Sequence, residues 1–200
     1  MEQNLDMLRQ EIVDKSLQAF REGLFSGTSG NMSCRVAPDE MLITPTSVRY
    51  DVLRARDIVR MKLDGTLLEG KMQPSSEWRM HAAVYEAYGE TNAVFHTHSP
   101  YATAFAVVRE SIPAVLIESR VFLGGDIRCA DYAAPGTKEV GVNAVPALKD
   151  RGGCTLANHG VLAVGKDLAQ AYLRAEYIED VAKIYTFSKV LGTPVEIASL

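Results

Sequence analysis

The chain has 200 residues, of which 47% are hydrophobic, and a formal net charge of −4, which together predict one domain covering residues 1–200. The 21 basic and 25 acidic residues are interspersed and form no basic stripe, which argues against nucleic acid and anionic membranes as partners. An acidic start without a signal-peptide pattern and three scattered cysteines predict a cytoplasmic location.

The first part of the chain is predicted to contain one helix and a hairpin. Apolar residues at helical spacing run from Leu5 to about Gly23. A glycine- and serine-rich stretch at 26–31 follows, and two strand-like segments, 32–36 and 41–44, then flank a turn. These segments are typical of an antiparallel pair.

The middle of the chain predicts a second hairpin and a capped helix. Segments 57–63 and 66–70 are joined by an Asp-Gly turn. Pro74-Ser75-Ser76-Glu77 opens a helix that reaches about Gly89, and one of the two serines is expected as its N-cap.

The remaining segments continue this alternation of helices and strands. The predicted order is a strand at 93–98, a helix at 101–108, an apolar run at 112–117, a strand at 127–132, a helix from 135, strands at 154–157 and 161–164, and a helix at 167–190. Because tight turns join several strands, the pattern predicts an α/β fold with a mainly antiparallel sheet and helices on both faces.

Two imidazoles end the apolar run at 93–98. Side chains of a strand alternate between faces, so His96 and His98 point to the same face. His159 ends another short apolar run, directly before a glycine. Three such residues are typical of a divalent metal site, with zinc as the first candidate; ordinary hydrogen-bonded residues at strand ends are the alternative. His81 lies inside a predicted helix and is interpreted as a packing or surface residue.

Glu77 and the hydroxyls near it allow two interpretations. A carboxylate in the first turn of a helix either takes part in chemistry or only favours the helix dipole. Ser75 and Ser76 either cap the helix or, with free backbone N–H groups, bind an anion. The sequence has neither a nucleotide-binding glycine loop nor a nucleophile elbow that would indicate another chemistry.

Five short motifs together resemble one family. Gly-Thr-Ser-Gly-Asn (27–31), Thr-Pro-Thr (44–46), Pro-Ser-Ser-Glu (74–77), His-Thr-His-Ser (96–99) and Asn-His-Gly (158–160) occur in the order and spacing of the class II sugar-phosphate aldolase/epimerase family. The resemblance covers nearly the whole chain. It implies a three-layer α/β/α sandwich around a mainly antiparallel sheet, and a homotetramer with active sites at subunit interfaces.

The resemblance also implies residue roles. His96, His98 and His159 match the ligands of one Zn²⁺ per subunit, with Mn²⁺ or Co²⁺ as alternatives, and Glu77 matches a catalytic acid/base that also ligates the metal. The substrate-phosphate pocket is matched by Gly30, Asn31, Thr46, Ser47, Ser75 and Ser76. The implied reaction is retro-aldol cleavage of a small phosphorylated sugar, a ketose 1-phosphate like fuculose 1-phosphate, to dihydroxyacetone phosphate and an aldehyde.

The sequence departs from the family pattern at two places. Ser47 stands where the family often has glycine, and Ile117 stands where the fuculose-phosphate enzymes have a tyrosine that donates a proton. Glu118, Arg120 and Tyr132 are candidate replacements for that tyrosine. Three alternatives stay open: methylthioribulose-1-phosphate dehydration, pentulose-phosphate 4-epimerisation, and a non-catalytic interaction module like that of adducin.

Overall fold

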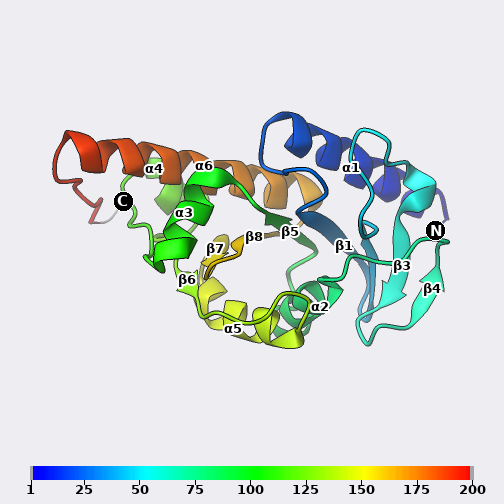
Figure 1. Ribbon diagram of the computed structural model, residues 1–200. Coiled ribbons are helices and arrows are strands. Elements are labelled where there is room, and N and C mark those ends of the chain that lie inside the picture. Colours follow the sequence, from blue (N-terminus) through cyan, green and yellow to red (C-terminus); the bar gives the residue numbers. More distant parts are fainter. Residues whose placement is uncertain (1, 199–200) are drawn as a thin grey trace.

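One eight-stranded sheet forms the centre of the computed structural model, which describes residues 2–198 (Figure 1). The strand order is β4-β3-β2-β1-β5-β8-β7-β6, and every neighbouring pair is antiparallel except β6 and β7. The strands are β1 (Asn31–Ala37), β2 (Glu40–Ile43), β3 (Val59–Lys62), β4 (Leu67–Glu69), β5 (Ala93–Thr97), β6 (Cys129–Ala130), β7 (Gly153–Leu156) and β8 (Gly160–Gly165). The predicted mainly antiparallel sheet is therefore confirmed.

Helices cover both faces of this sheet. The helices are α1 (Glu2–Arg21), α2 (Trp78–Ala87), α3 (Pro100–Val108), α4 (Ile117–Val121), α5 (Lys138–Leu148) and α6 (Leu168–Leu191), with a short 3₁₀ helix at Ala55–Asp57. In Figure 1, α1 and α6 lie above the sheet and α2 and α5 below it. The three-layer α/β/α arrangement is confirmed.

The two faces of the sheet bury separate hydrophobic cores. Alternation along β5 shows how this happens, because Phe95 packs with α1, α3 and α6 while Val94 packs with α2 and α5. Both side chains are fully buried. A strand that is apolar on both sides, as β5 is, therefore fits a central position in the sheet.

Three details differ from the sequence predictions. Neither serine is the N-cap of α2: Glu77 occupies that position, and the Ser75 hydroxyl accepts the backbone N–H of Glu77 at 3.3 Å, one residue before the helix begins. The strand expected at 127–132 is reduced to β6, because Ile127 pairs with Ile112 in an isolated bridge. Helix α4 falls in a region for which no helix was predicted.

Candidate metal centre

Four side chains from three parts of the fold converge at the ends of central strands of the sheet. His96 lies in β5, His98 just beyond it, His159 in the turn between β7 and β8, and Glu77 at the start of α2. One ligand atom from each of these residues lies within 4.8 Å of the others. The four residues for which metal binding is predicted are thus brought together.

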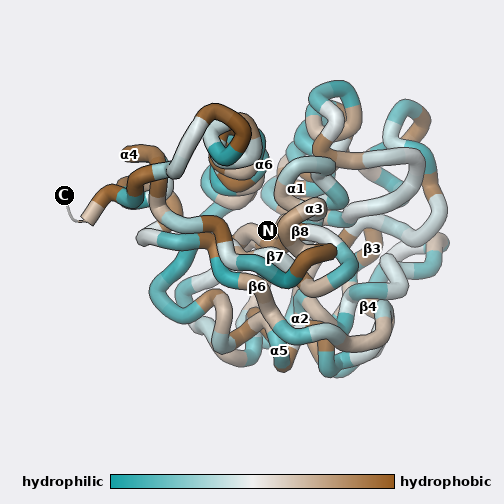
Figure 2. The backbone as a smooth tube through the Cα atoms, turned by 60° about the vertical axis from the view of Figure 1, so that its left-hand side comes forward, coloured by the Kyte–Doolittle hydropathy of each residue, from teal (hydrophilic) through white to brown (hydrophobic). Residues whose placement is uncertain are grey.

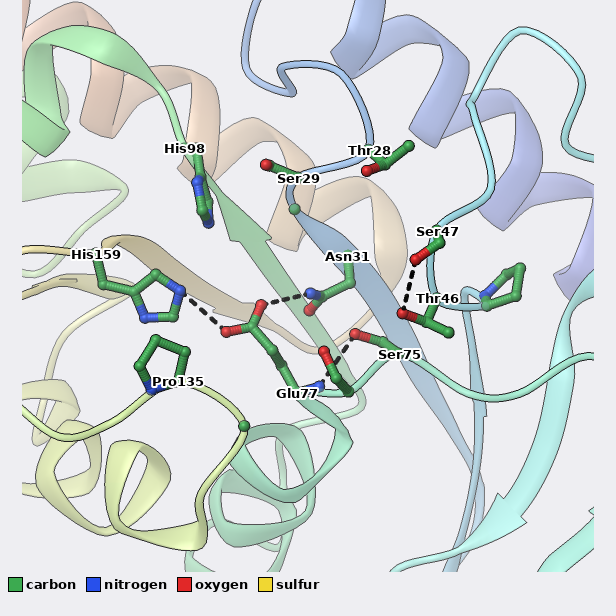
Figure 3. A pocket seen from close by; sticks show the side chains of 14 residues that line it. Thr28, Ser29, Asn31, Thr46, Ser47, Ser75, Glu77, His98, Pro135 and His159 are labelled. Atoms are coloured by element: carbon green, nitrogen blue, oxygen red, sulfur yellow. Dashed lines mark hydrogen bonds and ion pairs between the residues drawn. The ribbon is translucent and has the colours of Figure 1, made fainter.

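The closest contacts within this group involve the imidazole Nε2 atoms. His96 Nε2 lies 3.0 Å from His98 Nε2 and 3.2 Å from Glu77 Oε2. His159 Nε2 lies 2.9 Å from Glu77 Oε1. Figure 3 shows His98, His159 and Glu77 directed toward one another at one end of a pocket.

The hydrogen bond on the far side of His96 determines what its Nε2 can do. His96 Nδ1 lies 2.8 Å from the carbonyl oxygen of Val161, which can only accept, so Nδ1 carries the hydrogen. In the neutral ring, Nε2 then presents a lone pair toward Glu77 Oε2 and His98. Lone pairs that converge in this way repel one another unless a cation lies between them, and the donor set therefore fits a metal ion.

The surroundings of Glu77 and His98 also favour the protonation states that bind a metal ion. Burial raises the pKa of the Glu77 carboxyl, but the His96 and His159 imidazoles lower it by more, so that Glu77 is ionised. Burial, together with His96 and His159, lowers the pKa of His98 to about 4. A carboxylate and a neutral imidazole are the forms that bind a divalent metal.

A glycine makes the close approach of the β7–β8 turn possible. A Cβ atom at Gly160 would lie 2.3 Å from the carbonyl oxygen of Thr97, 3.2 Å from His96 Cε1 and 3.3 Å from His98 Cδ2. Only glycine can therefore stand beside both imidazoles. Asn158 supports the same turn with a left-handed backbone (φ 55°), a conformation that asparagine tolerates well.

A pocket of about 410 Å³ opens beside these ligands, and most of the residues that line it have neutral polar side chains. It is lined by Thr28, Ser29, Gly30, Asn31, Pro45, Thr46, Ser47, Ser75, Ser76, Glu77, His98, Pro135, Gly136 and His159. All six residues predicted for the phosphate pocket are among them, and none of these lining residues is a lysine or arginine. An anion here would be held by hydroxyl and amide groups.

Sequence reasoning missed part of this lining. Thr28 and Ser29 belong to the glycine- and serine-rich stretch at 26–31 and to the Gly-Thr-Ser-Gly-Asn motif, so a signal for them was present in the sequence. Pro135 and Gly136 were interpreted only as the start of a helix, and nothing in their local sequence indicates the pocket. Ser47 has a left-handed backbone (φ 59°), which explains why glycine suits this position.

The family model for the "Class II Aldolase and Adducin N-terminal domain" matches residues 10–186 of the chain. The chain belongs to the class II aldolase family. It is 39% identical over 199 residues to an L-fuculose phosphate aldolase of Escherichia coli (strain K12), covering 100% of this chain and 91% of the relative. A solved structure of an L-fuculose 1-phosphate aldolase superposes with a TM-score of 0.90 at 38% identity, covering 95% of this chain and 90% of the other.

Another relative carries the name of an aldolase for a different sugar phosphate. A 5-deoxy-D-ribulose 1-phosphate aldolase of Bacillus thuringiensis serovar kurstaki is 38% identical over 189 residues, covering 93% of this chain and 87% of the relative. With these relatives and an intact group of three histidines and a glutamate, the chain is a metal-dependent aldehyde-lyase rather than an adducin-like interaction module.

Proposed function

We propose that this class II aldolase cleaves a ketose 1-phosphate by a retro-aldol reaction to dihydroxyacetone phosphate and an aldehyde. One observation carries the proposal: three of the four grouped metal-binding side chains, Glu77, His98 and His159, line a pocket whose other lining residues are neutral and include several hydroxyl groups and an amide. This arrangement offers a place for a metal beside a place for a phosphate. The names of the relatives, which act on fuculose phosphate and 5-deoxyribulose phosphate, support the substrate class.

The proposed cofactor is one Zn²⁺ per subunit, held by His96, His98, His159 and Glu77, with Mn²⁺ or Co²⁺ as alternatives. Three imidazoles and a carboxylate suit zinc. When bound, the metal supplies a Lewis acid that stabilises negative charge on the carbonyl side of the substrate. Because His96 Nδ1 is held by the Val161 carbonyl oxygen, its ring orientation is fixed before any metal arrives.

In this proposal Glu77 moves the proton. The bond between the third and fourth carbons of the ketose breaks while the hydroxyl proton on the fourth carbon passes to the acid/base group opposite Glu77, and the aldehyde forms. The electron pair remains on the third carbon, and Glu77, after taking up a proton from solvent, delivers that proton to this carbon to give dihydroxyacetone phosphate; the opposite group returns its proton to solvent, so that no net proton is gained or lost. Glu77 is 9% exposed and lies on the pocket wall, so its carboxylate can reach a substrate while staying shielded from most water.

The phosphate is proposed to bind in the same pocket, on the side of Glu77 away from His98 and His159 (Figure 3). Gly30, Asn31, Thr46, Ser47, Ser75 and Ser76 all line it, and the two serines precede the first turn of α2. The positive end of the helix dipole favours an anion there. Fixing the phosphate in this way aligns the reacting carbons with Glu77.

The chain is proposed to act in the cytoplasm, as a homotetramer whose active sites lie at subunit interfaces. For the oligomer, the supporting observation is a set of large apolar side chains that lie exposed on α4 and the end of α6, namely Ile117, Val121, Ile184, Phe187, Val190 and Leu191. Figure 2 shows hydrophobic segments at α4 and toward the C-terminus. Such exposed apolar side chains favour contact with other subunits. Among the described residues, no helix has the length and apolar character needed to cross a membrane.

The proton donor opposite Glu77 is proposed to come from a neighbouring subunit. Glu118, Arg120 and Tyr132 are the candidates, and none of them is among the residues that line the pocket within one chain. Tyr132 is 54% exposed, which leaves its hydroxyl free to reach another molecule.

The first experiment offers the zinc-loaded protein a panel of ketose phosphates, including fuculose 1-phosphate, 5-deoxyribulose 1-phosphate and methylthioribulose 1-phosphate. Mass spectrometry should detect dihydroxyacetone phosphate and the matching aldehyde. Loss of water without carbon–carbon cleavage would instead indicate a dehydratase, and a change of configuration alone would indicate an epimerase.

The second experiment replaces the proposed acid/base. In Glu77→Gln the side-chain shape stays while the proton acceptor is lost, so kcat is expected to fall by about 10²–10⁴-fold. Metal content, measured by atomic emission, should stay near one per chain because the three histidines remain. Turnover equal to that of the unchanged protein would remove Glu77 from the proposed mechanism.

A further inference from the structure

A row of buried polar side chains leads from Glu77 into the protein interior. Asn31 Nδ2 lies 2.9 Å from Glu77 Oε2, and the other side of the Asn31 amide contacts His81 Nε2. Ser33 Oγ lies 2.7 Å from His81 Nδ1 and 2.8 Å from the Tyr85 hydroxyl. Asn31, Ser33, His81 and Tyr85 are each at most 3% exposed.

The row forms because two structural periods meet. Asn31 and Ser33 are two residues apart in β1 and face the same side of the sheet. Glu77, His81 and Tyr85 follow one another at intervals of four along the start and body of α2, so they share one face of the helix. Where this helix face lies on the strand, residues from the two elements alternate along the row.

The direction of every hydrogen bond in the row follows from the Asn31 amide. Its NH₂ group can only donate and faces Glu77 Oε2, so its Oδ1, which can only accept, takes the hydrogen of His81 Nε2. Neutral His81 then accepts at Nδ1 from the Ser33 hydroxyl.

The far end of the row follows the same direction. Since the Ser33 hydroxyl proton points to His81, its oxygen accepts from the Tyr85 hydroxyl. All donors therefore point toward Glu77, and such chains of aligned hydrogen bonds strengthen one another.

The state of His81 agrees with this direction. Its side chain is fully buried, and burial, together with the nearby His96, lowers its pKa to about 3. His81 is therefore neutral near pH 7 and carries a single ring N–H. The row needs that hydrogen on Nε2.

We propose that His81 is a positioning residue that acts on Glu77 through Asn31. By donating from Nε2 to Asn31 Oδ1, His81 fixes the orientation of the amide, and the amide NH₂ then holds Glu77 Oε2 at the angle needed for proton transfer. This inference rests on the proposed function, because it assigns His81 a part in the proton step of Glu77. The interpretation of His81 as an ordinary packing or surface residue is incomplete, since the side chain is neither exposed nor apolar in its contacts.

The competing explanation is that the row only attaches α2 to the sheet. The two explanations differ in what a substitution changes, because a purely structural role alters stability and leaves kcat intact. His81→Phe removes both hydrogen bonds while keeping a ring. His81→Gln keeps an amide that can donate to Asn31 and accept from Ser33.

Val84 provides the matched control. It is fully buried in the same helix but packs in the hydrophobic core on that side of the sheet, outside the row. Val84→Ala is expected to lower the thermal midpoint and leave kcat unchanged, which measures what loosening α2 alone does.

For the zinc-loaded enzyme we expect His81→Phe to lower kcat by about 10–100-fold, the range seen when outer partners of a metal or catalytic group are removed. The exchange of carbon-bound hydrogen of dihydroxyacetone phosphate with deuterated water should fall in parallel, because this half-reaction uses only the Glu77 proton step. Metal content should stay near one per chain. His81→Gln should retain most of the kcat.

The proposal is overturned if His81→Phe is as active as Val84→Ala, or if His81→Gln loses as much kcat as His81→Phe. A second measurement needs no turnover: in the metal-free, ¹⁵N-labelled protein, nitrogen NMR should find the His81 hydrogen on Nε2. A hydrogen on Nδ1, or on both nitrogens, would also overturn the proposal. If the unchanged enzyme cleaves no ketose phosphate, the proposed function fails instead, and the NMR result still tests the row.

Discussion

Gly160, which begins β8 directly after the β7–β8 turn, gives a sharp test of how the ligands are held together. In Gly160→Ala the new Cβ would lie 2.3 Å from the Thr97 carbonyl oxygen, whereas a carbon–oxygen contact needs about 3.3 Å. The turn must therefore move by about 1 Å, and it carries His159 with it. Strain of this kind costs about 1–3 kcal/mol in the free energy of unfolding.

The same displacement should weaken metal binding. His159 would move away from His96 and Glu77, and we expect zinc affinity to fall by about 10–100-fold, as measured by competition with a coloured chelator. Urea denaturation of the metal-free protein measures the stability change separately. Gly89→Ala is the matched control, because a Cβ at Gly89 meets nothing within 4 Å. Gly160→Ala with the affinity and stability of Gly89→Ala would refute the reasoning.

Two further predictions concern Ser47 and His81. Ser47→Gly removes a side chain from a residue with a left-handed backbone, so the free energy of unfolding should rise by about 1 kcal/mol. Loss of the hydroxyl should also weaken inhibition by inorganic phosphate by about tenfold. A loss of stability would contradict the strain argument. Because the pKa of His81 is lowered to about 3, the unfolded chain binds an extra proton below about pH 6.5, so stability falls with pH there. Between pH 6 and 5, urea denaturation of the metal-free proteins should show that the free energy of unfolding of His81→Gln changes less with pH than that of the unchanged protein, by up to about 1.4 kcal/mol per pH unit. Equal changes with pH in the two proteins would show that His81 does not titrate on unfolding.

The metal-binding group shows which parts of the site local sequence patterns can predict. A period of two places His96 and His98 on one face, and the structure has their Nε2 atoms 3.0 Å apart. The arrival of His159 beside them depends on β8 pairing with β5, a contact between segments that no local pattern specifies. The family resemblance supplied that information, because the order of its motifs reflects a whole fold.

The buried row of Asn31, His81, Ser33 and Tyr85 behind Glu77 could not be predicted from either a local pattern or the family motifs. The interval of four from Glu77 to His81 is visible in the sequence, but it indicates only a shared helix face. Whether that face meets water, apolar side chains or polar ones depends on β1 lying against it with Asn31 and Ser33 turned inward. The short strand β6 has a similar cause: Ile127 finds a partner in Ile112 instead of extending the strand.

Glu77 lies where three environments meet, and this explains why its position needs support from outside the ligand group. Toward the ligands it contacts His96 and His159, toward the pocket it borders bound substrate in our proposal, and toward the interior it accepts from Asn31. A carboxylate held only by a metal would be free to turn whenever the metal changed its ligands. The Asn31 amide, fixed in turn by His81, remains in place throughout, so Glu77 can exchange a proton from a constant orientation.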